Sequence, residues 1–221
     1  LSIIRQELAI SIAFFAFYFL EKKNYKKYFL LMLLAFSFHL TVIFVFFIHI
    51  IAIKFARKLV PKHYFIFIII SLIFSVLHLE KYVVQYTYSK YTDLMSDGEQ
   101  VNIVKTIILN SVVILSLFFY KTLCKKERNK YIFFFVVLAT IMVNIFSSFT
   151  VFTRISYYFR AYEVILIAEL VFFFVPKYRS LITFLAFCYY FALFAGSLNN
   201  DIKIDYKQES KLTPYKTFLN D

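Results

Sequence analysis

Glycine and proline are scarce in this sequence, whose 221 residues include 2 Gly and 3 Pro. A bilayer-spanning β-barrel needs strands of alternating polarity joined by many turns, and turns draw on both of these residue types. The apolar stretches here are unbroken blocks. The sequence therefore excludes a barrel and predicts helices, because a segment inside a bilayer must satisfy its own backbone hydrogen bonds.

Signatures of nucleotide, metal and serine chemistry are missing as well. Gly98 and Gly196 stand alone, so there is no glycine-rich phosphate loop. His, Cys and acidic residues do not share metal-site spacing, and the sequence contains neither Asp-x-Asp nor Gly-x-Ser-x-Gly. The two cysteines, Cys124 and Cys188, give no disulfide framework. We therefore expect no cofactor, no metal and no serine nucleophile.

Apolar residues make up 62% of the chain, with 31 Phe and 18 Tyr. Long apolar runs at this frequency are typical of proteins that cross a membrane several times. We expect an all-α polytopic transmembrane bundle of about six spans. Residues 1–197 would form the membrane domain and 198–221 an extracytoplasmic tail. Because the chain begins inside an apolar segment, we expect it to be the C-terminal part of a longer protein.

The net charge of +12 would suit nucleic acid, but its distribution indicates a membrane. Most of the excess Lys and Arg lies in short loops between apolar segments, as it does on the cytoplasmic side of membrane proteins. Four such loops are expected to be cytoplasmic: 21–27, 54–62, 121–130 and 176–179. This pattern excludes nucleic acid as a partner.

The apolar stretch 28–53 lies between two of these basic loops. A single crossing would put the two loops on opposite sides, and two full crossings need about 40 residues. A re-entrant helical hairpin with His39 at its tip satisfies both conditions, provided that the tip lines a cavity or is buried in protein. One long tilted helix that violates the charge rule is the alternative.

The stretch 153–169 opens another apolar segment, although it carries four ionised residues. Such groups are costly in a spanning helix and by default face a protein interior or a watery cavity. Read as one helix, the stretch presents on one face Arg154, Tyr158, Tyr162 and Glu169. Arg160 and Glu163, three positions apart, suit an ion pair. Arg154 would then bind an anion at the mouth of a cavity; alternatively, the two arginines only anchor the helix at the interface.

Cationic and polar residues gather toward the outer ends of the expected spans: Arg5, Gln6, His39, Lys105, Arg154 and Arg160. A cavity that collects them is built for anions. An arginine fork binds a diphosphate bidentately without an obligatory metal, and neutralising the developing charge helps the diphosphate leave. A lipid-linked diphosphate that enters through the membrane would explain a cationic cavity in a wall of Phe and Ile.

A resemblance to a known family rests on four short motifs: IIRQELAISIAFF with Arg5, Gln6 and Ala9; KKNYKKYFLLMLLAFSFHLTVIF with Ala35 and His39; TRISYYFRAY with Arg154, Tyr158 and Phe159; and TPYKTF with Pro214 and Tyr215. In order and spacing they resemble the EpsG family of Wzy-type polysaccharide polymerases over essentially the whole chain. The resemblance implies a multi-pass membrane glycosyltransferase that polymerises undecaprenyl-diphosphate-linked oligosaccharide repeat units into exopolysaccharide or capsule. Its active site would face the outside of the cell membrane, beside other polysaccharide-assembly membrane proteins.

The resemblance also implies roles for residues of this chain. Arg5 and Arg154 would hold the diphosphate, and His39 would orient or deprotonate the acceptor hydroxyl, whose proton must leave. Glu163 is a second candidate for the base, although an ion pair with Arg160 would occupy it. Further substrate contacts are expected from Gln6, Lys105, Tyr158, Arg160, Glu163 and Tyr215.

Three other functions fit parts of the pattern. A flippase or transporter for the same lipid-linked sugars has a cationic cavity, but it usually shows paired halves and helices broken at Gly or Pro. A membrane acyltransferase that modifies polysaccharide would use a histidine such as His39. In a purely structural subunit every polar group is a packing detail, and clustering of Arg5, His39 and Arg154 would count against that reading.

Overall fold

The computed structural model describes residues 2–77, 79, 103–146, 150–173 and 176–191. Every regular element within these residues is an α-helix, which confirms the predicted all-α fold. The chain divides into two compact units, residues 1–170 and 171–221. The expected outer loop 80–100 and the tail 198–221 lie outside the described residues.

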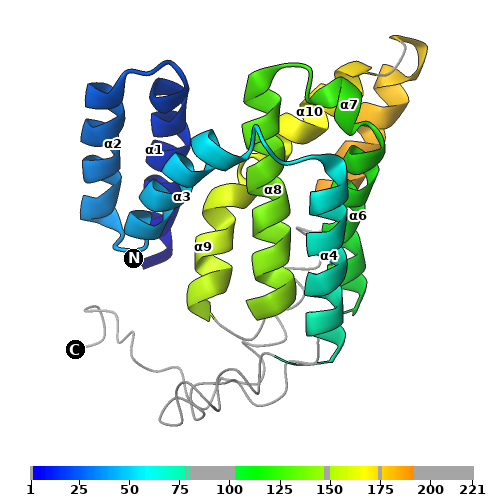
Figure 1. Cartoon of the computed structure of the whole chain (residues 1–221), viewed down its shortest axis with the longest axis horizontal. Coiled ribbons are helices and arrows are strands. Elements are labelled where there is room, and N and C mark those ends of the chain that lie inside the picture. Colours follow the sequence, from blue (N-terminus) through cyan, green and yellow to red (C-terminus); the bar gives the residue numbers. More distant parts are fainter. Residues whose placement is uncertain (1, 78, 80–102, 147–149, 174–175, 192–221) are drawn as a thin grey trace, which may run out of the picture. The chain divides into compact units, whose positions relative to one another are not determined.

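The first unit begins with two antiparallel helices, α1 (Ser2–Glu21) and α2 (Tyr25–Phe38), packed along each other (Figure 1). In the turn between them Lys23 has a φ of 58°. The Asn24 amide donates to the Phe19 carbonyl at 2.8 Å, closing the end of α1, and the Asn24 side chain caps the first turn of α2. A left-handed L-residue costs about 1–2 kcal/mol, so these hydrogen bonds fix the turn against that strain.

A break at His39 separates α2 from α3 (Val42–Phe55), and its backbone is extended, with φ −152° and ψ 123°. Each helix has 14 residues, which is about 21 Å at 1.5 Å per residue. That is shorter than the bilayer core of about 30 Å. The stretch is thus a helical hairpin broken where the sequence suggested, and the single long helix is wrong.

Three helices form the other side of the first unit: α4 (Pro61–Val76), α6 (Ile103–Phe118) and α8 (Glu127–Phe146), with the four-residue α7 (Tyr120–Leu123) after α6. Buried amides join them. The Asn144 amide donates to the Ser71 hydroxyl at 2.9 Å and exchanges two hydrogen bonds with Asn110, at 3.0 and 3.1 Å. Because buried polar groups need partners, this network fixes how the three helices face one another.

The stretch 153–169 is not one helix, so that expectation was wrong. It belongs to α9 (Thr150–Arg160) and α10 (Glu163–Phe173), which are joined by a turn at residues 161–162. The turn carries Tyr162 into the buried core, and tertiary packing thereby overrides the local helical pattern. Glu169 consequently leaves the face that holds Arg154.

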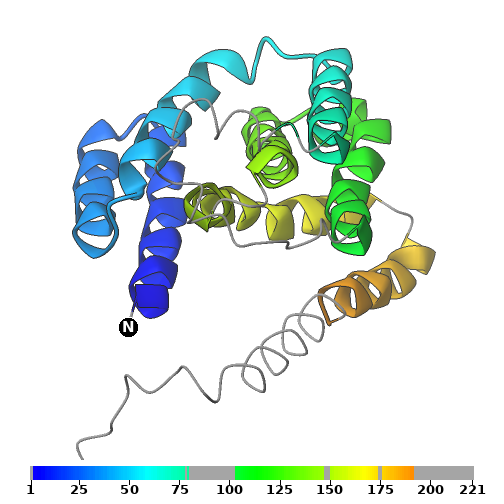
Figure 2. The ribbon, with the colours of Figure 1, turned by 90° about the horizontal axis from the view of Figure 1, so that it is seen from below.

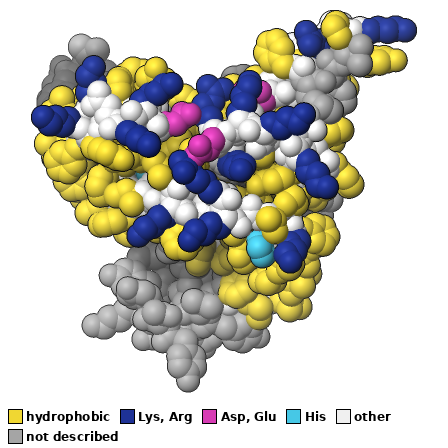
Figure 3. Space-filling model, turned by 45° about the horizontal axis from the view of Figure 1, so that its top comes forward, with side chains coloured by type: hydrophobic (Ala, Val, Ile, Leu, Met, Phe, Trp, Pro, Cys, Tyr) yellow, Lys and Arg dark blue, Asp and Glu magenta, His cyan; other side chains and the backbone are white. Residues whose placement is uncertain are grey.

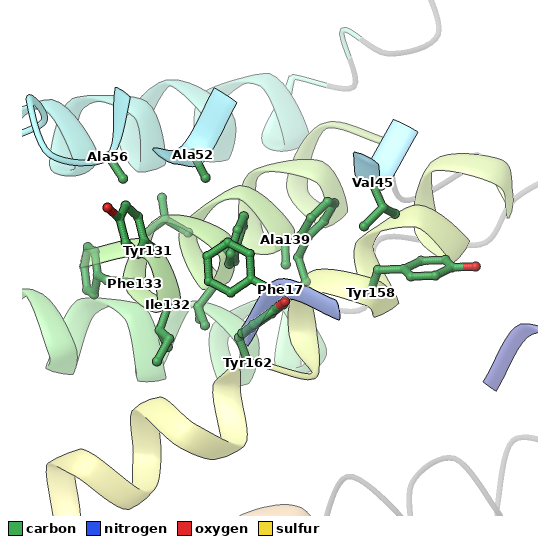
Figure 4. Packing of buried hydrophobic residues seen from close by; sticks show 14 of the residues in the cluster. Phe17, Val45, Ala52, Ala56, Tyr131, Ile132, Phe133, Ala139, Tyr158 and Tyr162 are labelled. Carbon is green, nitrogen blue, oxygen red and sulfur yellow. The ribbon is translucent and has the colours of Figure 1, made fainter. Parts of the chain in front are cut away.

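An aromatic cluster fills the core between these helices (Figure 4). The Phe17 ring centroid lies 4.9 Å from that of Phe135 and 5.7 Å from that of Tyr162, both nearly edge-on. Beside the rings, fully buried alanines on α1 and α3 leave room for close helix approach: Ala9, Ala13, Ala16, Ala52 and Ala56. Large rings and small residues together determine the spacing of the helices.

The basic loops 22–27, 54–62 and 121–130 lie at one end of the first unit (Figure 1), and Figure 3 shows Lys and Arg side chains gathered there. The N-terminus of α1, the His39 break and the start of α9 lie at the opposite end (Figures 1 and 2). Loop 121–130 is shorter than expected, because α8 already begins at Glu127. Among the described residues of the first unit, most Lys and Arg side chains therefore lie at the first of these two ends.

The lengths of the described helices test the expected number of membrane spans only in part. Of the described residues, only α8, with 20 residues, is a long enough and sufficiently apolar helix to cross a bilayer by length and composition. The apolar helices α3 and α4 have 14 and 16 residues. In the second unit residues 176–191 are helical, so the loop expected at 176–179 is wrong. The count of about six spans stays a prediction.

The left-handed turn residue gives a first test. We expect Lys23→Gly to raise the free energy of unfolding by about 1 kcal/mol, or the midpoint by about 2–4 °C, because glycine adopts this φ without strain. Lys22→Gly is the matched control. Its amide continues the α1 ladder to the Tyr18 carbonyl at 3.1 Å, so glycine there should lower stability. Thermal unfolding in detergent measures both, and equal shifts would contradict the turn geometry.

Candidate functional site

The start of α1 and the start of α9 contact each other at the end of the first unit opposite the basic loops. The Gln6 side chain, 7% exposed, donates a hydrogen bond from Nε2 to the backbone carbonyl of Arg154 at 3.2 Å. The two residues are 148 positions apart in the chain. The start of α1, with Arg5 beside Gln6, therefore lies against α9 close to Arg154.

The tip of the helical hairpin reaches the same helix. His39 Nδ1 lies 2.6 Å from the Thr41 hydroxyl oxygen, and the Thr41 hydroxyl donates to Tyr158 Oη at 3.3 Å. Tyr158 follows Arg154 by four positions on α9, so both lie on one helix face. The Tyr158 side chain is buried, whereas His39 and Thr41 are half-buried. The structure thus brings together the predicted site residues Arg5, Gln6, His39, Arg154 and Tyr158.

The arginines of the first unit differ in whether they have an acidic partner. Three arginines have acidic partners: Arg57 with Glu127, Arg128 with Glu169 at 3.1 Å, and Arg160 with Glu163 at 3.3 Å. Arg5 and Arg154 are exposed, and no described side chain pairs with either. Their guanidinium donors are therefore available to an anion from outside the protein.

The Arg160–Glu163 ion pair expected within residues 153–169 is confirmed. Arg160 and Glu163 meet at the turn between α9 and α10. Arg160 follows Arg154 by six positions, about 9 Å along the helix axis. Glu163 is 5% exposed and contacts the Arg160 guanidinium, so it lies apart from the His39 cluster.

Two sequence-predicted contacts cannot be placed in this cluster. Lys105 belongs to α6, but its side chain lies outside the described part of the structure. Tyr215 lies outside the described residues altogether. Both stay predictions.

Sequence reasoning missed the parts played by Thr41 and Glu7. The signal for Thr41 was its place in a polar group, with Ser37 and His39, inside an apolar stretch. The Glu7 carboxylate interacts electrostatically with the Tyr158 hydroxyl. Glu7 follows Gln6 directly, so the contact between α1 and α9 brings it there.

His49 is the packed core residue that the sequence suggested. It is 1% exposed, and its two ring nitrogens lie 3.5 Å from the Tyr28 hydroxyl and 3.4 Å from the Tyr162 hydroxyl. These contacts connect α2 and α3 to the α9–α10 turn. His49 therefore supports the hairpin from inside the bundle.

Nucleophilic thiol chemistry does not fit Cys124. Among the described residues no three His, Cys, Asp or Glu side chains are grouped to hold a metal ion. Cys124 lies between α7 and α8, and burial raises the pKa of its thiol to about 12. A thiol with so high a pKa is protonated at neutral pH and is unreactive.

This pKa predicts the alkylation behaviour of Cys124. At pH 8, well below a pKa of about 12, the thiol stays protonated and buried, so iodoacetamide should modify it at least about tenfold more slowly than in the unfolded chain. Mass spectrometry of the protein in mild detergent and in dodecyl sulfate measures the ratio. Cys188, which is exposed, serves as the internal reference. Equal Cys124 rates in the two states would contradict the packing around α7.

Comparison with known proteins places the chain in one family. No curated protein and no solved structure matches it. A family model described as the EpsG family matches residues 1–217 of the 221. That range includes α1, the hairpin and α9, from which the cluster is built. Because the match covers essentially the whole chain, this protein belongs to the EpsG family.

Proposed function

We propose that this protein polymerises undecaprenyl-diphosphate-linked oligosaccharide repeat units into exopolysaccharide or capsule. Membership of the EpsG family implies a membrane protein and suggests a polysaccharide-polymerase role. The observation that carries the proposal is that hydrogen bonds of Gln6 and Thr41 join the start of α1 and the hairpin tip to α9, so that Arg5, His39 and Arg154 lie at one end of the first unit. Two guanidinium groups without an acidic partner among the described residues, together with an imidazole, suit an anionic leaving group and a hydroxyl nucleophile.

The charge difference between the two ends supports an orientation in the membrane. Basic loops face the cytoplasm in membrane proteins, so the cluster of Arg5, His39 and Arg154 faces the outside. In this arrangement the short helices α2 and α3 form a re-entrant hairpin within a multi-pass bundle of about six spans. The hairpin tip is tolerated because it is held against α9.

The chemistry assigned to the site is glycosyl transfer with a lipid diphosphate as the leaving group. A hydroxyl at the non-reducing end of one repeat unit attacks the anomeric carbon of the growing chain. The bond from that carbon to the diphosphate oxygen breaks, and the electron pair leaves with the diphosphate. Arg5 and Arg154 neutralise the charge that develops there, and His39 accepts the hydroxyl proton.

The remaining predicted contacts surround this centre. Gln6 fixes the start of α1 against the Arg154 carbonyl. Lys105, Arg160 and Tyr215 are assigned to the bound sugars and phosphates, and Glu163 is the reserve base. The other partners are the bilayer itself and the membrane proteins that supply the lipid-linked units.

Replacing Arg154 tests the proposed reaction. In a strain that lacks the gene, complementation with Arg154→Ala should reduce polymer at least about 100-fold and accumulate single lipid-linked repeat units, since a lost charge-stabilising donor costs about 10²–10³ in rate. Gels of surface and lipid-linked glycans measure both. Arg128→Ala, which removes a paired arginine at the basic end, should leave the polymer ladder intact.

The same gels discriminate the rival functions. Single units trapped on the cytoplasmic side in the gene-deleted strain would identify a flippase. An unchanged ladder with altered acetyl content would identify an acyltransferase. A full ladder from Arg154→Ala would remove the diphosphate role of that residue.

Replacing His39 tests the proton acceptor. We expect His39→Gln to slow polymerisation by about 10²–10⁴, because glutamine keeps a similar shape but accepts no proton. Its control is His63→Gln at the start of α4, where His63 Nδ1 accepts from the Val60 amide at 3.3 Å, far from the cluster in the chain. Wild-type ladders from His39→Gln, with the protein present at normal level, would refute the role.

A further inference from the structure

The hairpin tip contains a short hydrogen-bonded chain that leads away from His39. It runs from His39 Nδ1 to the Thr41 hydroxyl at 2.6 Å, and from that hydroxyl to Tyr158 Oη at 3.3 Å. Thr41 and Tyr158 are 117 positions apart. Such a chain has a direction, because each hydroxyl donates one proton and accepts others.

The hydrogen bond from Thr41 to Tyr158 gives this direction, and the neighbouring charge of Glu7 favours it. The Glu7 carboxylate interacts electrostatically with the Tyr158 hydroxyl, and a negative charge attracts the hydrogen end of the phenol dipole. The Tyr158 oxygen therefore presents its lone pairs to Thr41, and Thr41 donates to it. With its proton used in this way, the Thr41 oxygen can only accept from His39.

The direction determines which nitrogen of His39 carries the proton. In a neutral imidazole one ring nitrogen donates and the other accepts. Because Nδ1 must donate to Thr41, the ring is protonated at Nδ1 and keeps its lone pair at Nε2. Among the described residues none hydrogen-bonds to Nε2, and the His39 side chain is only half-buried.

We infer that Thr41 and Tyr158 are positioning residues that hold His39 in the Nδ1-protonated tautomer, with Nε2 as its open proton acceptor. The tautomer follows from the His39–Thr41–Tyr158 contacts and the charge of Glu7. Its use rests on the proposed function, in which Nε2 takes the proton of the acceptor hydroxyl. Reversal of the chain would put the proton on Nε2, and Nε2 would then be a hydrogen-bond donor that cannot accept the proton of the acceptor hydroxyl.

Nitrogen NMR of the histidine rings tests the tautomer without any substrate. The protein is labelled with ¹⁵N-histidine and placed in nanodiscs of phosphatidylethanolamine and phosphatidylglycerol at a pH where the ring is neutral. His39→Gln assigns the signals by loss. In the wild type we expect a protonated-type Nδ1 and an unprotonated-type Nε2, whereas an Nε2-protonated ring would overturn the inference.

Three variants then test the two positioning residues. Thr41→Val removes the hydroxyl at nearly constant shape, and Tyr158→Phe removes the acceptor that orients it; each should convert His39 wholly or partly to the Nε2-protonated form. Thr41→Ser keeps the hydroxyl and should restore the wild-type spectrum. An unchanged tautomer in both Thr41→Val and Tyr158→Phe would refute the positioning role.

His49 supplies the internal control for folding. The Tyr28 hydroxyl donates to the Phe46 carbonyl at 3.4 Å, so its oxygen accepts from His49 Nδ1, and Nε2 accepts from Tyr162. His49 signals that stay in place show that the variants are folded. If Thr41→Val unfolds and shifts them, Tyr158→Phe and Thr41→Ser still decide the question.

Polymer ladders from the same variants separate this inference from the proposed function. We expect Thr41→Val to reduce polymer at least about tenfold and Thr41→Ser to restore it, in parallel with the tautomer. A switched tautomer with a normal ladder would confirm the positioning role and refute His39 as the base. An unswitched tautomer with a reduced ladder would refute the positioning role and leave the proposed reaction standing.

Discussion

A buried polar group without a partner is costly, and in this apolar bundle that cost decides where the helices meet. Gln6 connects α1 to α9, Thr41 connects the hairpin to α9, and Asn144 connects α8 to α4 and α6. Between these hydrogen bonds the helices bury apolar rings and alanines. Such apolar contacts allow one helix to shift along another more readily than a hydrogen bond does. Polar contacts therefore set the register of the first unit, and the aromatic cluster fills it.

The same constraint distinguishes arginines that have an acidic partner from those that have none among the described residues. Arg57, Arg128 and Arg160 each contact a carboxylate, which balances their charge inside the protein. Arg5 and Arg154 have no such partner among the described residues and are exposed. Helical spacing in the sequence indicated the Arg160–Glu163 pair but not the partners of Arg57 and Arg128, which lie far away in the chain. Among the described residues, Arg5 and Arg154 are left without an acidic partner at the end of the first unit that also holds His39.

Individual helices and ion pairs show which features could be predicted from the sequence. The break at His39 followed from counting residues between two basic loops, and the Arg160–Glu163 pair from helical spacing; both are present. The single helix over 153–169 was wrong, because no Gly or Pro marks the turn and the burial of Tyr162 imposes it. Glu169 consequently meets Lys126 and Arg128 at the basic end. Local periodicity could not reveal a bend whose cause lies in α1, α3 and α8.

The sequence by itself determined the helical class, the position of three basic loops and the break at His39, because these depend on composition and on distances along the chain. The four family motifs also placed the chain in the EpsG family. Only the tertiary structure decided which arginines lack an acidic partner among the described residues, and that Thr41 lies between His39 and Tyr158. The physical reason is that these contacts join residues 117 or 148 positions apart. Contacts at that separation leave no periodic trace in the sequence, and they depend on how whole helices pack.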